Sequence, residues 1–285
     1  MSDERLPIMK TYKLYIGGKF PRTESGRSTL VQDSSNGLTA HVCHGSRKDV
    51  RNAVEAAHSA HSKWSSATGY LRGQILYRLA EMMEGKRSEL AEAIGNEHAT
   101  REVDASIDRV VHFAGWTDKY ASVMGGANPV SGPYHNFTIP GSMGVVGCVC
   151  PDQPPLLGLI SMIAGPIALG NSVVAIVSES NPIPAMVLAE AFATSDLPGG
   201  VVNLITGFRE ELVPHLATHR EVIGVHAGSV SDEHRAVLRE GAAVNMKRVT
   251  IHDDALDYFD ESQAQGPAWI DPFVEFKTIW HPSAV

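Results

Sequence analysis

The sequence predicts an α/β fold built on a doubly wound, Rossmann-like parallel sheet. A continuous apolar run at 144–150 ends at Pro151 and is typical of a strand buried on both faces. Four more apolar runs follow, at 172–177, 201–205, 222–226 and 248–251. Helical periodicity fills the intervals between them, over 156–169, 182–194, 210–218 and 231–240. This repeated alternation of strand and helix predicts parallel strands joined by crossover helices.

The first half of the chain is predicted to be mainly helical. It opens with an extended stretch at 13–20 that contains a Gly-Gly turn. Ser46, with Asp49 three residues later, is suited to cap a helix that runs to about Trp64. Further helices are expected at 70–85 and 89–94, and a longer one from Asp104 to the glycine pair at 125–126.

Two segments outside these regions alternate between apolar and polar residues, as half-exposed strands do. Residues 128–140 predict a weakly hydrophobic ribbon, and 273–280 predict a terminal amphipathic strand. Such a strand needs a sheet edge to join, and the doubly wound sheet offers none. A partner subunit's edge is the natural candidate, and pairing inside the same chain is the alternative.

Composition excludes several classes of function. The formal net charge of −8 and the pI near 5.9 argue against nucleic-acid or anionic-membrane binding. The 13 histidines lack the spacing of a zinc site, so no metal is expected. Three cysteines suit a reducing cytoplasm, and Cys148 and Cys150 are expected on one side of a buried strand. Residues 1–5 lack the start of a signal peptide, and no apolar run is long enough for a membrane span.

Ordered motifs across residues 10–257 resemble the aldehyde dehydrogenase superfamily. Among them are Gly144-Val145-Val146-Gly147 leading to Pro151 and Pro155, Leu197-Pro198-Gly199-Gly200, and Gly207-Phe208. Gly228-Ser229 continues the series, and 275–280 is similar to the family's oligomerisation strand. An ordered chain of motifs is more specific than a lone glycine pattern.

The resemblance implies a division of the chain into five parts. Residues 1–127 would form the N-terminal strand and helices of a cofactor-binding domain, and 143–257 its Rossmann-like NAD(P)-binding part. Residues 128–142 would be an oligomerisation hairpin and 273–285 the C-terminal oligomerisation strand. Residues 258–272 would then be a linker where the family has its catalytic domain, and no cysteine follows Cys150 to act as nucleophile.

The site residues that the resemblance implies are altered in this chain. Gln153 stands where the family has an oxyanion-binding asparagine, and Gly241 is matched to its general-base glutamate. Ile176 replaces the lysine that holds the cofactor ribose, whereas the ribose-binding glutamate is kept as Glu179. The remaining cofactor positions implied by the family are Pro151, Gly207, Gly228 and Ser229.

We therefore expect NAD(P) to bind weakly or not at all. The glycine turn at Gly228-Ser229 before a helix favours a pyrophosphate, because free N–H groups and the helix dipole attract anions. Asp232 and Glu233 in the first turn would repel it. Losing a lysine hydrogen bond costs roughly a further 1.5–3 kcal/mol.

Three functions are consistent with these features. The first is a non-catalytic subunit, a pseudoenzyme that assembles with itself or with a full-length aldehyde dehydrogenase through 128–140 and 273–281. The second is an NAD(P)-dependent aldehyde oxidoreductase that is active only with a partner supplying the catalytic domain. The third is a sensor of a nucleotide or small metabolite at the crevice beyond the strand ends.

Overall fold

The computed structural model describes residues 9–32 and 39–283, so the predicted absence of a signal peptide at residues 1–5 lies outside the described residues. Its centre is a parallel sheet in the order β10-β9-β6-β7-β8. The strands are β6 (Val145–Val149), β7 (Ser172–Ile176), β8 (Val202–Ile205), β9 (Val222–Gly228) and β10 (Arg248–His252). The predicted doubly wound sheet is confirmed, with every strand within a few residues of its expected place.

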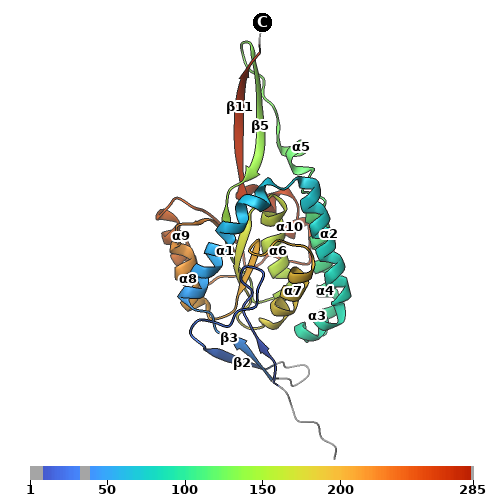
Figure 1. Cartoon of the computed structure of the whole chain (residues 1–285), viewed down its shortest axis with the longest axis vertical. Helices are drawn as coiled ribbons and strands as arrows, with labels where there is room; N and C mark the ends of the chain where they lie inside the picture. The colour runs from blue at the N-terminus through green and yellow to red at the C-terminus, as the bar shows by residue number, and fades with distance from the viewer. Residues whose placement is uncertain (1–8, 33–38, 284–285) are drawn as a thin grey trace, which may run out of the picture.

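Helices cover both faces of this sheet (Figure 1). One apolar core joins the sheet to α2 (Gly69–Gly85), α4 (Ala99–Ala114), α6 (Pro155–Ala168) and α7 (Ile183–Thr194), with α3 (Arg87–Ile94) beside α4. The other core joins it to α1 (Arg47–Ser66), α8 (Arg209–Thr218) and α9 (Asp232–Ala243). Cys148 and Cys150 are both fully buried in the first core, as predicted. Among the described residues, no helix is long and apolar enough to cross a bilayer.

In the N-terminal region, the Gly-Gly turn predicted within 13–20 is present, with Ile16 bridging Lys19, and most helices lie near their predicted places. Ser46 and Asp49 form the expected capping box at the start of α1. The single helix expected from Asp104 is wrong in its bounds, because α4 starts at Ala99 and ends at Ala114, and a separate α5 (Tyr120–Met124) follows. A small sheet of β1 (Thr11–Tyr12), β2 (Ser28–Gln32) and β3 (Thr39–Cys43) was not predicted.

A second sheet projects from the body as an arm, at the opposite end from β2 and β3 (Figure 1). It consists of β4 (Gly126–Ala127), β5 (Tyr134–Ser142) and β11 (Val274–Pro282), in the order β11-β5-β4. β11 pairs antiparallel with β5 along all nine of its residues. The predicted ribbon and terminal strand are therefore confirmed as strands. The edge that β11 joins belongs to its own chain and not to a partner subunit.

Residues 253–273, which we call the return segment, connect the end of β10 to the start of β11. The segment contains α10 (Glu261–Ala264) and two short 3-10 turns, η1 (Pro267–Trp269) and η2 (Asp271–Phe273). Its Tyr258, Trp269 and Phe273 are at most 3% exposed. The stretch expected to be a linker, 258–272, thus contains one short helix and packs into the core.

The return segment lies along one face of β9 and runs in the opposite direction. An atom of the Phe273 ring lies 3.3 Å from where a Cβ of Gly224 would stand. The ring of His226 is 5.4 Å from that of Trp269, and the Tyr258 hydroxyl lies over Gly228. Gly224 and Gly228, on the same face of β9, thus make room for Phe273 and Tyr258, which pack on this face beside Met162 of α6.

Two buried polar side chains hold the return segment in place. The guanidinium of Arg109, on α4, donates to the carbonyls of Tyr258 and Ala264 at 2.9 and 2.6 Å, and also to the Ser161 hydroxyl on α6. The Asn171 amide donates to the Phe273 carbonyl at 3.0 Å and accepts from the backbone N–H groups of residues 143 and 144. Each links the segment to the parallel sheet or to its helices.

A pair of histidines lies beneath the return segment. His226 Nδ1 is 2.8 Å from the Met162 carbonyl, and its Nε2 is 2.7 Å from Nε2 of His252. The carbonyl can only accept, so His226 is protonated at Nδ1 and its Nε2 accepts from His252. The His252 ring stacks on Trp269 at 4.1 Å. Burial lowers the pKa of His226 to about 3 and that of His252 to about 4, so both rings are neutral.

This pair predicts a loss of stability in mild acid. Because both folded-state pKa values lie below the ordinary value of 6.5, the unfolded chain binds protons first as the pH falls. The stabilisation is complete well above pH 6.5 and is lost as the pH falls towards 3, at up to about 2.7 kcal/mol per pH unit while both rings take up protons only in the unfolded chain. Replacing both residues, His226→Phe with His252→Phe, should flatten the pH dependence of urea denaturation in this window. The exposed control His98→Gln should leave the slope unchanged.

Candidate functional site

The carboxyl ends of the parallel strands bring most of the predicted site residues to one edge. Pro151 and Gln153 follow β6, Glu179 follows β7, Gly207 follows β8, and Gly228 and Ser229 stand at the end of β9. The helices after β6 and β9 lie on opposite faces, so these neighbouring strands form the switch point of the sheet. In doubly wound sheets, the crevice at this point is where ligands bind.

The side chain of Arg209 bridges this switch point. Arg209 is the first residue of α8 and is only 8% exposed. Its guanidinium donates to the Cys150 carbonyl beyond β6 and, at 3.3 Å, to the Ser229 carbonyl beyond β9. The Asp152 carboxylate lies 3.2 Å from the same group. A buried guanidinium with a carboxylate partner therefore occupies the space between the two strand ends.

Other polar groups at this edge are also engaged within the chain. One carboxylate oxygen of Asp152 accepts from the backbone N–H groups of Glu179 and Ser180, at 2.7 and 3.1 Å. The Glu179 carboxylate accepts from the Arg209 backbone N–H at 2.7 Å. Asp152 and Glu179 thus hold together the loops after β6, β7 and β8. Neither Arg209 nor Asp152 was singled out from the sequence.

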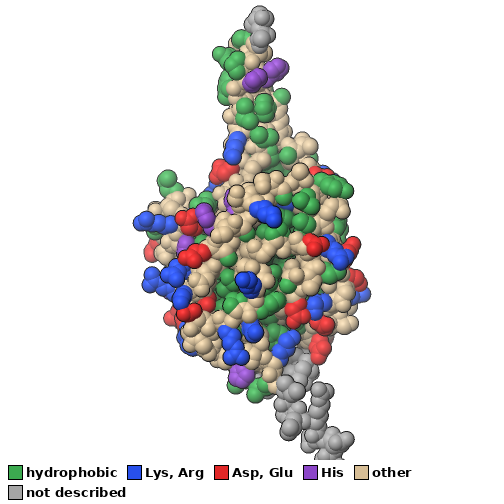
Figure 2. All heavy atoms as spheres, viewed as in Figure 1, with side chains coloured by type: hydrophobic (Ala, Val, Ile, Leu, Met, Phe, Trp, Pro, Cys, Tyr) green, Lys and Arg blue, Asp and Glu red, His purple; other side chains and the backbone are tan. Residues whose placement is uncertain are grey.

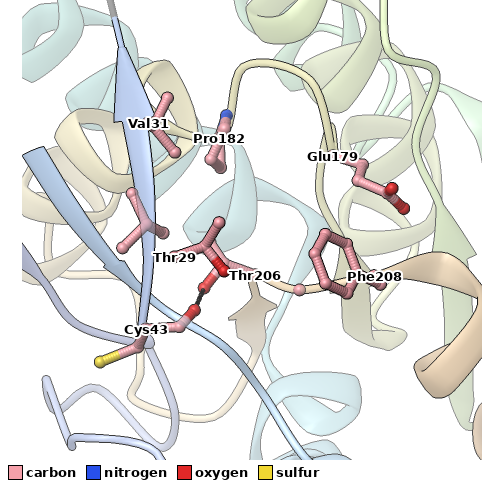
Figure 3. Close-up of a pocket in the computed structure, with 9 residues that line it drawn as sticks. Thr29, Val31, Cys43, Glu179, Pro182, Thr206 and Phe208 are labelled. Atoms are coloured by element: carbon pink, nitrogen blue, oxygen red, sulfur yellow. Dashed lines mark hydrogen bonds between the residues drawn. The ribbon is translucent and has the colours of Figure 1, made fainter. Parts of the chain in front are cut away.

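The cavity beside Glu179 is too small for a nucleotide. It measures about 30 Å³ and lies between the β2–β3 strands and the loops after β7 and β8 (Figure 3). Phe208 and Pro182 form part of its wall, and the Thr206 hydroxyl donates to the Cys43 carbonyl on its floor. Ligand pockets usually enclose roughly 300–1,000 Å³.

Ile176 is the last residue of β7 and is fully buried in the core beneath α1 and α8. It offers no group that could bind a ribose hydroxyl. At the other side of the switch point, Ser231 caps α9, and Asp232 and Glu233 stand in its first turn. The predicted placement of both carboxylates at this helix N-terminus is confirmed, and they set a negative charge where a phosphate would otherwise be attracted.

Tyr258 of the return segment covers Gly228. A Cβ added at Gly228 would stand 2.3 Å from the Tyr258 hydroxyl oxygen, so the phenol rests directly on the glycine backbone. The hydroxyl is buried without a hydrogen-bond partner, and so is Nε of Arg209. Burial raises the pKa of Tyr258 above its ordinary value, which keeps the phenol neutral. The glycine turn predicted to receive a pyrophosphate is thus covered by the chain itself.

Gly241 lies apart from the other predicted site residues. It stands within α9, where an added Cβ would come within 2.6 Å of the Ala217 carbonyl on α8. This contact gives Gly241 a packing role away from the sheet edge. The residue at the carboxyl end of β10 is His252, which is held between His226 and Trp269.

A larger cavity, of about 310 Å³, opens next to Gln153 and the return segment. Acidic and polar side chains line much of it, including Asn96, His98, Glu102, Asp254 and Asp257. Glu102 is 2% exposed, and its carboxylate accepts from the backbone N–H groups of Leu156 and Leu157 at the start of α6. Burial raises the pKa of Glu102. No feature of the sequence had indicated this cavity.

The two cysteines at the end of β6 are buried and unreactive. Burial raises the pKa of Cys150 to about 12 and that of Cys148 well above its ordinary value, so both thiols stay protonated. Within the described ranges, no group of three or more histidine, cysteine or acidic side chains could hold a metal ion.

Comparisons with known proteins agree with this architecture. The model of the "Aldehyde dehydrogenase family" matches residues 21–253. The chain belongs to the aldehyde dehydrogenase family. It is similar to DhaS of Bacillus subtilis, with 32% identity over 86% of this chain and 50% of that protein. The mitochondrial aldehyde dehydrogenase of Sus scrofa is 33% identical over 78% of this chain and 44% of its own length.

The fold agrees with solved structures of the family. The NAD+ complex of an aldehyde dehydrogenase from Bacillus cereus has a TM-score of 0.79 and 26% identity, covering 85% of this chain and 50% of that one. This family member thus spans about half the length of the relatives it matches.

The contact between Tyr258 and Gly228 predicts coupled effects on stability. Gly228→Ala should destabilise the fold by about 2 kcal/mol, because the new methyl group must displace the phenol. Tyr258→Phe should stabilise it by about 1 kcal/mol, since it removes a buried hydroxyl that has no partner. The double variant should be more stable than the sum of the single changes predicts, as measured by urea denaturation. Strict additivity would show that the two residues do not touch.

Proposed function

We propose that this chain is a non-catalytic member of the aldehyde dehydrogenase family, a pseudoenzyme subunit that acts through assembly. It assembles with itself or with a full-length aldehyde dehydrogenase, and its place is structural or regulatory. The observation that carries the proposal is the side chain of Arg209, which bridges the ends of β6 and β9 at the switch point.

The residues at this edge do not fit a dinucleotide. An NAD(P) molecule lying across the switch point would have to displace Arg209 from its carbonyl partners and Tyr258 from Gly228. Ile176 supplies no hydrogen bond in exchange. The carboxylates of Asp232 and Glu233 carry the same negative charge as the cofactor's pyrophosphate and would repel it. Without a bound cofactor or a reactive thiolate, this chain has no means of oxidising an aldehyde by itself.

The arm supports the statement that the chain assembles with another protein. β5 and β11 keep a full antiparallel pairing although the residues between β10 and β11 number only twenty-one. Several large apolar side chains of the arm are exposed, among them Tyr134, Phe276 and Trp280. Exposed apolar side chains gathered on one projection are typical of a surface that binds another protein.

Calorimetric titration with NAD+ and NADP+ tests the statement that the chain does not bind a dinucleotide. We expect no saturable binding up to about 1 mM, corresponding to less than about 4 kcal/mol of binding free energy. Arg209→Gly combined with Tyr258→Ala opens the edge and should yield weak but measurable binding. A full-length aldehyde dehydrogenase serves as the positive control. Micromolar affinity of the unaltered chain would refute this half of the proposal.

An activity assay with the same two proteins tests the alternative function, an NAD(P)-dependent aldehyde oxidoreductase completed by a partner. NAD(P)H formation from a panel of aldehydes is measured with the chain alone, with a full-length homologue, and with both. We expect the chain to add no activity of its own. Turnover that requires both proteins, and that is lost with Glu179→Gln in this chain, would establish the alternative instead.

A further inference from the structure

The cavity of about 310 Å³ next to Gln153 has an acidic lining. Its walls contain the carboxylates of Glu102, Asp254 and Asp257, and none of the described residues that line it is lysine or arginine. On the face of the molecule in Figure 2, by contrast, acidic and basic side chains are interspersed over the body. A concave surface that carries charge of one sign concentrates ions of the opposite sign, so this cavity favours a cation.

Glu102 is the buried member of these three carboxylates. It is 2% exposed, and its Oε1 accepts from the backbone N–H groups of Leu156 and Leu157 at 2.7 and 3.1 Å. Within the described ranges, its Oε2 has neither a hydrogen-bond partner nor a basic side chain as counter-ion. The hydroxyl of Tyr258, another lining residue, is a second buried polar group that no described residue pairs with. A buried carboxylate oxygen without a partner is costly, and a positively charged donor in the cavity would offset that cost.

The other two carboxylates belong to the return segment and lie nearer the mouth of the cavity, because both Asp254 and Asp257 are exposed. One oxygen of Asp257 accepts from the backbone N–H of Phe259 at 2.8 Å, which orients the carboxylate. Pro154 and Leu256 add apolar surface to the wall. The cavity therefore offers one buried carboxylate, two exposed carboxylates and apolar surface to a single ligand.

Two arginines near the lining already have other partners. Arg101 stacks on the Phe259 ring, with 4.5 Å between its guanidinium carbon and the ring centroid. Arg209 bridges the ends of β6 and β9 and lies 3.2 Å from the Asp152 carboxylate. In the part of the chain that the structure describes, neither arginine forms an ion pair with a carboxylate of the cavity. The negative charge of the lining is thus available to a ligand.

We propose that this cavity binds a short aliphatic diamine in its doubly protonated form. One ammonium group donates to Oε2 of Glu102, and the second lies at the mouth with Asp254 and Asp257. The methylene groups between them contact Pro154 and Leu256. The cavity is at the lower end of the range of roughly 300–1,000 Å³ for ligand pockets, which suits a small ligand. The inference goes beyond the proposed function, because it requires neither assembly nor a dinucleotide.

Calorimetric titration of the full chain with 1,4-diaminobutane, at neutral pH and low ionic strength, tests the inference. We expect saturable binding at one site per chain, which weakens as salt is added because the mouth of the cavity is exposed. 1-Aminobutane, which lacks the second ammonium group, should bind about fivefold more weakly. 1,4-Butanediol has the same length and no charge, and should show no binding.

Two sets of variants assign the two ends of the ligand. Glu102→Gln keeps an oxygen that can accept from the start of α6 but replaces Oε2 with an amide that donates. It should weaken binding of 1,4-diaminobutane about tenfold or more, since a hydrogen bond to a charged group is lost. Asp254→Asn with Asp257→Asn should weaken the diamine about fivefold and leave binding of 1-aminobutane unchanged. Asp253→Asn makes the same charge change just outside the lining, and this matched control should bind as the unaltered chain does.

The exposed pair Asp254 and Asp257 keeps the test decisive if Glu102→Gln does not fold. Absence of saturable diamine binding overturns the inference, and so does binding that neither set of variants weakens. Equal binding of 1-aminobutane and the diamine, or an equal loss with Asp253→Asn, also overturns it. Each of these outcomes leaves the proposed function standing, which fails separately if NAD(P) binds tightly.

Discussion

The structure depends on the short connection between β10 and β11. β10 ends at the carboxyl ends of the parallel strands, and β11 of the arm begins at their amino ends. The chain must therefore run back along the sheet between the two. It does so over the face of β9 that also contacts Met162 of α6, where Phe273, Trp269 and Tyr258 add apolar packing. Arg109 and Asn171 satisfy its buried carbonyls. One segment thus closes the core, positions the arm and covers the site edge.

This arrangement joins the two halves of the proposed function. Tyr258 covers Gly228 because the return segment has to pass there, and Arg209 is buried beside it. The same segment delivers β11 to β5 in full register. Covering the edge and keeping the arm are therefore consequences of one route of the chain, and they need not have arisen as separate adaptations.

The parallel sheet could be predicted because strands buried on both faces leave long apolar runs, and helices between them leave a distinct periodicity. The strand-end residues Glu179, Gly207 and Gly228 followed from the resemblance to the family. Arg209 and Tyr258 could not be predicted in the same way. Their roles depend on where a side chain points after the loops have folded, and an arginine after a glycine turn or a tyrosine in an acidic stretch carries no periodic signal. The resemblance also gave no indication that Gly241 lies in α9 and packs against α8.

The two glycines of β9 have a consequence for how such motifs are interpreted. Gly224 and Gly228 leave room for Phe273 and Tyr258, so a side chain at either position would collide with the return segment. The packing of Tyr258 is thus sufficient by itself to require glycine at position 228. A glycine that matches a family motif can therefore be required by packing alone, and its contacts in the structure show that this requirement exists at Gly228.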